Sequence, residues 1–285
     1  MKKLLIAAAC VFACFTANAQ KLDKGLLWKI SGNGLTKPSY LYGTMHVTCD
    51  ATLDVHTLAA LDVTDQLYLE LDMDDPALQS EMMGTIVMKD GVTMKSLATP
   101  EDYKVADDFL KENMGASLDM FNSFKPFMVS AFLYPKMIDC PAQSYEMALV
   151  TVAKEQKEEV LGLETVAEQM AVFDAIPYKE QMDELVKTAK DKMVNDKKEL
   201  AEMMALYNTR DLNELLAFMD KSGNKMMAAH NDVLLVNRNK NWIPKIEIIA
   251  KAKPTFFGVG AAHLAGENGV IKLLRKKGYK VEVVK

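Results

Sequence analysis

Short strand-like segments alternate with longer helix-like segments along almost the whole chain. Five segments carry the β-branched and aromatic residues that strands favour, and three- and four-residue apolar periodicity fills the stretches between them. The strand-like segments are 39–42, 66–73, 159–163, 255–259 and 279–284. Helices layered on a mainly parallel sheet bury the apolar residues of strands and helices that alternate in this way. The sequence therefore predicts an α/β fold with a mainly parallel sheet.

The helical stretches are rich in methionine. The chain of 285 residues contains 20 Met, and many of them fall near 114–147 and 182–227. Between 178 and 219, apolar residues recur at helical spacing while Lys, Asp and Glu fill the other face. Methionine packs irregular spaces with a flexible side chain. We therefore predict a large Met-rich helical insertion, roughly 76–158 and 174–250, within a single domain spanning 20–285.

The first twenty residues have the pattern of a secretory signal peptide. Two lysines precede a short apolar run, and an A-x-A cleavage site ends at Ala19. The run is too short to cross a bilayer as a helix, which takes about 20 residues. We expect cleavage near Ala19 and an exported protein, periplasmic or extracellular, whose mature chain has no transmembrane segment. Lipidation at Cys14 is an alternative, although the bulky Phe12 does not suit that type of site.

Loss of that segment would leave two cysteines, Cys49 and Cys140. An oxidising compartment permits a disulfide between them. Sequence alone does not show whether their Cα atoms lie close enough to pair, so a bonded pair and two free thiols both remain open.

The chain carries a formal net charge of −5. Proteins that grip nucleic acid need a basic face to neutralise phosphates. The sequence therefore argues against a nucleic-acid partner.

Two of the four histidines share a motif. Gly43-Thr44-Met45-His46 follows the segment 39–42, and Gly260-Ala261-Ala262-His263 follows the segment 255–259. A glycine at the end of a strand lets the backbone turn sharply or approach a ligand. Ligands of open α/β sheets bind at the carboxyl edge of the strands. We expect the sheet to bring His46 and His263 together, whereas His56 and His230 lack this context and are expected on the surface or in helix packing.

Two glutamates join these histidines. Glu70 lies among the leucines of the segment 66–73, where a buried carboxylate needs a cation or a metal. Glu164 follows the segment 159–163, again at a carboxyl end. Two histidines and a carboxylate form a common ligand set for zinc, iron or manganese. The alternative is that either glutamate caps a helix or pairs with a basic residue.

Arg238 lies between two asparagines and is expected in a polar turn. As a functional residue it would clamp a carboxylate or stabilise an oxyanion; otherwise it would be solvated. The chain contains no Gly-x-Ser-x-Gly, Walker or His-Glu-x-x-His motif.

Four blocks resemble the TraB/GumN family, the bacterial relatives of Tiki-type proteases. They occur in family order and span nearly all of 26–285. The blocks are LWKISGNGLTKPSYLYGTMHV, VLGLETVAEQMAVFDAIPYKEQ, RNKNWIPKI and FFGVGAAHLAGENGVIKLLRKKGYKV.

The resemblance implies an α/β superfamily shared with erythromycin-esterase-like and ChaN-like proteins. It implies paired Gly-x-x-His motifs and acidic residues at one site, and metal-dependent proteolysis in the Tiki relatives, with manganese or cobalt. By motif, His46 and His263 match the paired histidines and Glu70 matches the strand carboxylate. Glu164 and Arg238 match further family positions.

These observations predict an exported metal-dependent hydrolase, a Tiki-like metallopeptidase acting on a peptide or protein substrate. His46, Glu70 and His263 would hold a divalent ion of Mn, Co or Zn. Glu164 would be the general base or a second ligand, and Arg238 would steady the oxyanion. The alternatives are a non-catalytic protein that binds peptide, metal or haem in the same cleft, and a small-molecule esterase.

Overall fold

The computed structural model of the chain describes residues 21–285. The expected signal peptide at 1–19, with its cleavage site at Ala19, lies outside the described residues, as does the alternative lipid site Cys14. No helix within 21–285 is both long enough and apolar enough to cross a membrane.

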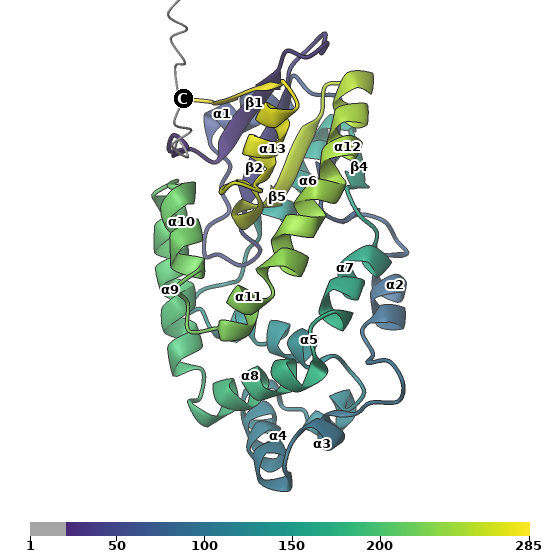
Figure 1. Ribbon diagram of the computed structural model, residues 1–285, viewed down its shortest axis with the longest axis vertical. Helices are drawn as coiled ribbons and strands as arrows, with labels where there is room; N and C mark the ends of the chain where they lie inside the picture. Colours follow the sequence, from purple (N-terminus) through teal and green to yellow (C-terminus); the bar gives the residue numbers. More distant parts are fainter. Residues whose placement is uncertain (1–20) are drawn as a thin grey trace, which may run out of the picture.

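One sheet organises the described residues, and its six strands run in the order β4-β3-β5-β2-β1-β6 (Figure 1). The strands β4, β3, β5 and β2 are parallel to one another, and β1 pairs antiparallel with β2 and β6. The structure thus confirms the predicted α/β fold with a mainly parallel sheet. The strands are β1 (Leu27–Ser31), β2 (Ser39–Thr44), β3 (Gln66–Leu69), β4 (Glu159–Gly162), β5 (Phe256–Gly260) and β6 (Lys280–Val283).

Strand β1 is absent from the sequence-based prediction. It forms a hairpin with β2, in which Trp28 pairs with Leu41. Both side chains are fully buried, so packing holds this strand in place. The connection between the two strands includes Gly32 and Gly34, with φ of 78° and 86°, which glycine adopts without steric cost. The sheet is therefore antiparallel at this side.

The predicted strand at 66–73 is shorter in the structure, because β3 ends at Leu69. Two further backbone hydrogen bonds follow the ends of β3 and β4. Leu163 N–H donates to the Leu69 carbonyl (2.8 Å), and Glu164 N–H donates to the Glu70 carbonyl (3.0 Å). These bonds keep Glu70 and Glu164 on adjacent backbones where the two strands finish.

Helices cover both faces of the sheet. In Figure 1, α12 and α13 lie in front of the sheet, and α1 and α6 lie behind it. Helix α6 contacts β3 and β4, and α13 contacts β6. Fully buried Trp28, Trp242, Phe256 and Phe257 are the bulkiest aromatic side chains of the core. The four helices are α1 (Val55–Leu61), α6 (Tyr145–Gln156), α12 (Asn237–Ala252) and α13 (Val270–Lys276).

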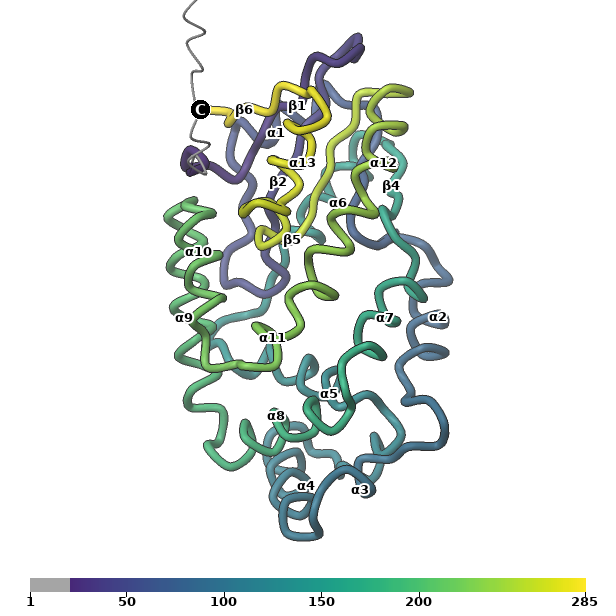
Figure 2. Tube along the Cα trace, viewed as in Figure 1, coloured from purple at the N-terminus to yellow at the C-terminus, as the bar shows by residue number. Residues whose placement is uncertain are grey.

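The other helices gather beyond the carboxyl ends of the parallel strands (Figures 1 and 2). Helix α8 packs against α4 and α5, and α2 packs against α7. Met94, Met182 and Met193 are buried in this packing, in agreement with a Met-rich helical layer, although the predicted ranges 76–158 and 174–250 also include α6 and most of α12, which cover the sheet. These helices are α2 (Leu78–Thr85), α3 (Met94–Leu97), α4 (Pro100–Met114), α5 (Pro126–Ala131), α7 (Val166–Asp174), α8 (Tyr178–Lys190), α9 (Val194–Asn208), α10 (Leu212–Met219) and α11 (Lys225–Ala229).

The charged stretch 178–219 divides into three helices, α8, α9 and α10. Backbone with positive φ separates them, at Lys192 (57°) and Met193 (61°) and at Arg210 (58°). Residues in the left-handed region end a helix, because they turn the chain out of the helical path.

Cys49 and Cys140 form a disulfide with a Cα–Cα distance of 5.6 Å. This settles the question that the sequence left open. Beside it, Thr48 and Gln143 exchange two backbone hydrogen bonds of 2.9 Å. The loop after β2 is thus attached to the segment that leads into α6.

Candidate active site

Four of the five predicted site residues follow the carboxyl ends of four adjacent parallel strands. Glu164 follows β4, Glu70 follows β3, His263 follows β5 and His46 follows β2. The fifth, Arg238, comes from α12. The sheet therefore brings together the residues that the sequence singled out, at the edge that faces the helical insertion.

Gly260 lies where three of these side chains converge. A methyl group built on its Cα would lie 3.2 Å from Oε1 of Glu70, 3.6 Å from Cδ2 of His263 and 3.7 Å from Nε2 of His46. The Gly260 N–H donates to the same Oε1 of Glu70 (2.8 Å). Glycine is needed here because a side chain would fill the space that these groups share.

The two Gly-x-x-His turns pack directly against each other. A Cβ on Gly43 would lie 3.1 Å from the Ala261 Cα and 2.9 Å from Cδ1 of Leu264. On its other side, the Tyr207 hydroxyl donates to the Gly43 carbonyl (2.7 Å). The glycine of the first motif thus permits close approach to the second motif.

Arg238 lies at the centre of the cluster. Its Nη2 donates to Oε2 of Glu70 and Oε1 of Glu164 (both 2.5 Å), and its Nη1 donates to Nε2 of His263 (3.1 Å). The guanidinium lies over the Trp242 ring, 4.9 Å from its centroid. Only 13% of the side chain is exposed. The expected polar turn is instead the first turn of α12, and Arg238 is largely buried there, where it clamps two carboxylates rather than being solvated.

A π-helical turn, η3 (Asp232–Val236), leads directly into α12. Arg238 Nη1 donates to the Leu234 carbonyl within this turn (3.2 Å). Such turns often occur at functional sites because they change which side chains face inward. Here the turn ends two residues before Arg238.

Both carboxylate oxygens of Glu164 are held by donors. Oε1 accepts from Arg238 and from Nε2 of Gln169 (3.0 Å). Oε2 accepts from Nε1 of Trp242 (3.1 Å) and from Nε of Arg238 (3.2 Å). The surroundings of Glu164 therefore fix both its own position and the plane of the guanidinium.

Glu70 is buried beside the same guanidinium. Burial alone would raise the pKa of this carboxyl, but the charge of Arg238 and the Gly260 N–H outweigh it and hold the pKa well below its usual range. Glu70 is therefore a carboxylate at neutral pH.

His263 is held as one tautomer. Nδ2 of Asn239 donates to the carbonyls of His263 (3.3 Å) and Asn268 (2.9 Å), so Oδ1 of Asn239 faces the ring and accepts from Nδ1 of His263 (2.6 Å). Nε2 is then the unprotonated nitrogen. Burial lowers the pKa of His263 to about 3, although the charge of Glu70 acts in the opposite direction. The ring is therefore neutral, and the lone pair of its Nε2 faces the cluster, where it accepts from Nη1 of Arg238.

His46 has a different partner. Its Nδ1 donates to Oε1 of Glu146 (2.7 Å), and 68% of its side chain is exposed. The protein atoms around the ring would by themselves lower the pKa, but the hydrogen bond and the charge of Glu146 outweigh them and raise the pKa of His46 to about 9. His46 is therefore protonated at neutral pH and has to release the proton of Nε2 to bind a metal.

The sequence did not single out Glu146, Asn239, Gln169 or Trp242. Trp242 lies four residues after Arg238, so both share a helix face. This spacing would have pointed to Trp242 only if the segment had been predicted as a helix. Glu146 and Gln169 had no local signal, because each is an ordinary polar residue in a helix. The two histidines left aside are elsewhere: His56 is exposed, and His230 pairs with Glu180 (2.8 Å).

A model of the TraB/PrgY/gumN family matches residues 26–283. The chain belongs to this family. It is also similar to the Metalloprotease TIKI2 and the Metalloprotease TIKI1 of Danio rerio, and to the Metalloprotease TIKI2 of Xenopus tropicalis. Each is 22% identical over 94% of this chain. The chain spans 62%, 65% and 61% of their respective lengths. No solved structure matches it.

The donors in this TraB/PrgY/gumN family member have the chemistry of a metal site. Histidines that bind metals usually donate their second ring nitrogen to an oxygen acceptor. Both His46 and His263 do so, through Nδ1, and Nε2 of His46 and Oε1 of Glu70 reach the space over Gly260. Within 21–285, no three His, Cys, Asp or Glu side chains are closely enough grouped to coordinate an ion as they stand. The residue types fit a divalent ion, but Nε2 of His263 would have to release its donor, Nη1 of Arg238, to bind it.

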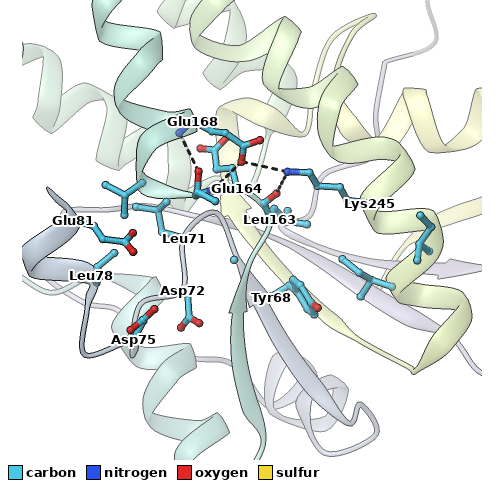
Figure 3. Close-up of a pocket in the computed structure, with 15 residues that line it drawn as sticks. Tyr68, Leu71, Asp72, Asp75, Leu78, Glu81, Leu163, Glu164, Glu168 and Lys245 are labelled. Carbon is cyan, nitrogen blue, oxygen red and sulfur yellow. Dashed lines mark hydrogen bonds and ion pairs between the residues drawn. The ribbon is translucent and has the colours of Figure 1, made fainter. Parts of the chain in front are cut away.

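A pocket of about 560 Å³ borders the cluster at Glu164 (Figure 3). Arg238 and His263 do not line it, so it is a neighbouring space rather than the centre itself. Lys245 is the basic residue in its wall, and it contacts Glu168 (3.4 Å) and the Leu163 carbonyl (2.7 Å). The acidic residues of the wall are Asp72, Asp75, Glu81, Glu164 and Glu168.

Proposed function

We propose that this TraB/PrgY/gumN family member is an exported, metal-dependent hydrolase that acts on peptide bonds. The observation that carries the proposal is the convergence of His46, Glu70 and His263 over Gly260, with Nδ1 of each histidine held by an oxygen acceptor. The similar proteins of Danio rerio and Xenopus tropicalis are named metalloproteases, which supports the same chemistry here.

His46, Glu70 and His263 would hold the divalent ion, of Mn, Co or Zn. Such an ion polarises a carbonyl and lowers the pKa of a bound water. His263 would offer its neutral Nε2 once Nη1 of Arg238, which donates to it, has moved away, and Glu70 would offer a carboxylate oxygen that also accepts from Gly260 N–H. A backbone N–H of this kind holds the carboxylate in place without occupying all of its lone pairs.

Arg238 would stabilise the negative charge that develops on the carbonyl oxygen of the substrate. A guanidinium that is already oriented costs no reorganisation when that charge appears. Glu164, Glu70 and Trp242 provide this orientation. To act as a base or a ligand, Glu164 would first have to release one of its donors, so we assign it the task of fixing Arg238.

Export is part of the proposal. A disulfide persists in oxidising compartments and is rare in the cytosol. The Cys49–Cys140 bond therefore supports the export expected from the N-terminal pattern, and periplasmic or extracellular peptides or proteins would be the substrates.

The test uses the purified mature chain after chelation of metals. Peptide hydrolysis is measured on a peptide library without metal and with Mn²⁺, Co²⁺ or Zn²⁺. Metal-dependent cleavage that is lost in His46→Ala and His263→Ala, and kept in the exposed control His56→Ala, is the expected result. Unchanged cleavage in His46→Ala and His263→Ala would overturn the proposal. Binding of metal, peptide or haem without cleavage would identify a binding protein, and cleavage of esters alone would identify an esterase.

A further inference from the structure

His46 and His263 are held in unlike ways. His263 is 3% exposed, and its ring lies 4.5 Å from that of Trp242, so packing as well as Asn239 fixes it. His46 has 68% of its side chain exposed. An exposed side chain is free to change rotamer, which costs entropy when a ligand requires one orientation. His46 therefore needs an anchor that packing does not supply.

Glu146 is that anchor. Its Oε1 accepts from Nδ1 of His46 at 2.7 Å, and the residue is only 7% exposed. Its other oxygen, Oε2, has no hydrogen-bond partner in the described part of the chain. Burial of a carboxylate is costly unless it is paired. The position of Glu146 is thus explained by its contact with His46 better than by a role in packing.

The two residues also share one support. Tyr145 N–H donates to the Met45 carbonyl (3.3 Å), which joins the residue before Glu146 to the residue before His46. The Thr48–Gln143 hydrogen bonds and the Cys49–Cys140 disulfide lie a few residues further along the same two segments. Glu146 is therefore fixed to the turn that carries His46, whatever the rest of the helical insertion does.

This contact decides which nitrogen faces the cluster. With Nδ1 directed at Glu146, the opposite nitrogen, Nε2, lies 3.7 Å from the methyl position on Gly260. Acceptors that orient a ligating histidine in this way typically change metal affinity or activity about 10- to 100-fold when removed.

We propose that Glu146 is a positioning residue that orients His46, so that Nε2 is presented to the space over Gly260. The expected effect on metal binding rests on the proposed function. The orientation of the His46 ring does not depend on that function.

The experiment compares wild type with Glu146→Ala and Glu146→Gln. Affinity for Mn²⁺ is measured by calorimetry, and kcat and KM are measured with the best peptide substrate. We expect Glu146→Ala to weaken Mn²⁺ affinity about 10- to 100-fold and to lower kcat with little change in KM. Glu146→Gln, whose amide oxygen still accepts from Nδ1, is expected to recover most of both quantities.

Glu180→Ala is the matched control, because Glu180 also contacts a histidine, His230, outside the cluster. Both quantities should remain at wild-type values in this variant. Mn²⁺ affinity in folded Glu146→Ala within twofold of wild type would overturn the proposal, as would equal losses in Glu146→Ala and Glu146→Gln.

A second measurement separates this inference from the proposed function. Two-bond ¹H–¹⁵N spectra of histidine-labelled protein show which ring nitrogen carries the hydrogen-bonded proton, with no metal or substrate. We expect an Nδ1 proton of His46 that exchanges slowly in wild type and in Glu146→Gln, and rapidly in Glu146→Ala. If wild type binds no metal, the metal site fails but this spectrum still tests the orientation. Identical His46 spectra in all three proteins would overturn it.

Discussion

Nη1 of Arg238 lies 3.1 Å from Nε2 of His263. A guanidinium is always a donor in proteins, so Nε2 must accept. This agrees with the role of Asn239, which takes the proton of His263 on Nδ1. The neutral histidine, two carboxylates and a single fixed cation thus form one hydrogen-bonded unit around the end of β5.

Arg238→Lys keeps the positive charge but loses the planar fork that reaches Glu70, Glu164 and His263 together. We expect the free energy of unfolding to fall by about 1.5–3 kcal/mol, the value of one hydrogen bond to a charged group. Urea denaturation measures it. The matched variant Arg210→Lys changes an exposed pair with Asp54 and should lose no more than about 1 kcal/mol. Equal losses in the two variants would contradict the central position of Arg238.

Gly260→Ala places a methyl group in the space between His46, Glu70 and His263. The φ of Gly260 is −49°, which alanine adopts, so we expect a fold of nearly wild-type stability. Activity and Mn²⁺ affinity should fall about 10- to 100-fold, because small displacements of reacting groups are that costly. Gly84→Ala is the control: its methyl meets nothing within 4 Å, and it should gain up to about 1 kcal/mol of stability in α2 with activity unchanged. A fully active Gly260→Ala variant would show that the chemistry lies elsewhere.

Replacement of Cys49 and Cys140 by serine removes a cross-link between residues 91 positions apart. We expect the free energy of unfolding to fall by about 2–4 kcal/mol, because the unfolded chain regains freedom. Comparison of denaturation curves for the double variant and for wild type, each with and without reductant, measures the effect. Reductant should destabilise wild type alone. If it leaves wild type unaffected, the bond does not form in solution.

The free energy of unfolding is expected to depend on pH through the carboxyl group of Glu158. Burial, Asp65 and Asp62 raise the pKa of Glu158 from its ordinary value of 4.5 to about 7. Folding raises the pKa of this carboxyl. Below the pKa of the unfolded state the carboxyl is protonated and the native state keeps its full stability. As the pH rises from there through the pKa of the folded state, the native state is progressively destabilised. Glu158→Gln should therefore become increasingly more stable than wild type between about pH 5 and about pH 8. Melting temperatures across this range test it, with exposed Glu155→Gln as control. A constant difference between Glu158→Gln and wild type would refute the raised pKa.

The sequence located the strand-end histidines because their signal is local. A glycine directly after a strand-like run predicts where the strand ends, and parallel strands place such ends at one edge. The same logic placed Glu164. The order of the strands follows from long-range packing, and no local pattern shows that β5 lies between β2 and β3.

Contacts that depend on tertiary distance were not predictable. Glu146 is one of several glutamates in helical segments, and its proximity to His46 depends on how α6 lies behind the sheet. The disulfide stayed open for the same reason, because pairing depends on the Cα distance. Arg238 was expected in a polar turn because it lies between two asparagines. In the structure, Asn239 is instead used as a donor and an acceptor within the cluster.

The position of β5 between β2 and β3 has a consequence for biosynthesis. The strand that separates the two others begins at Phe256, close to the end of the chain, and His263 follows it. A nascent chain that has not reached this strand has His46 and Glu70 on strands with no native neighbour between them. The native arrangement of His46, Glu70 and His263 therefore cannot form before the chain has reached His263, whereas the pairing of β3 with β4, which carries Glu70 and Glu164, does not require β5.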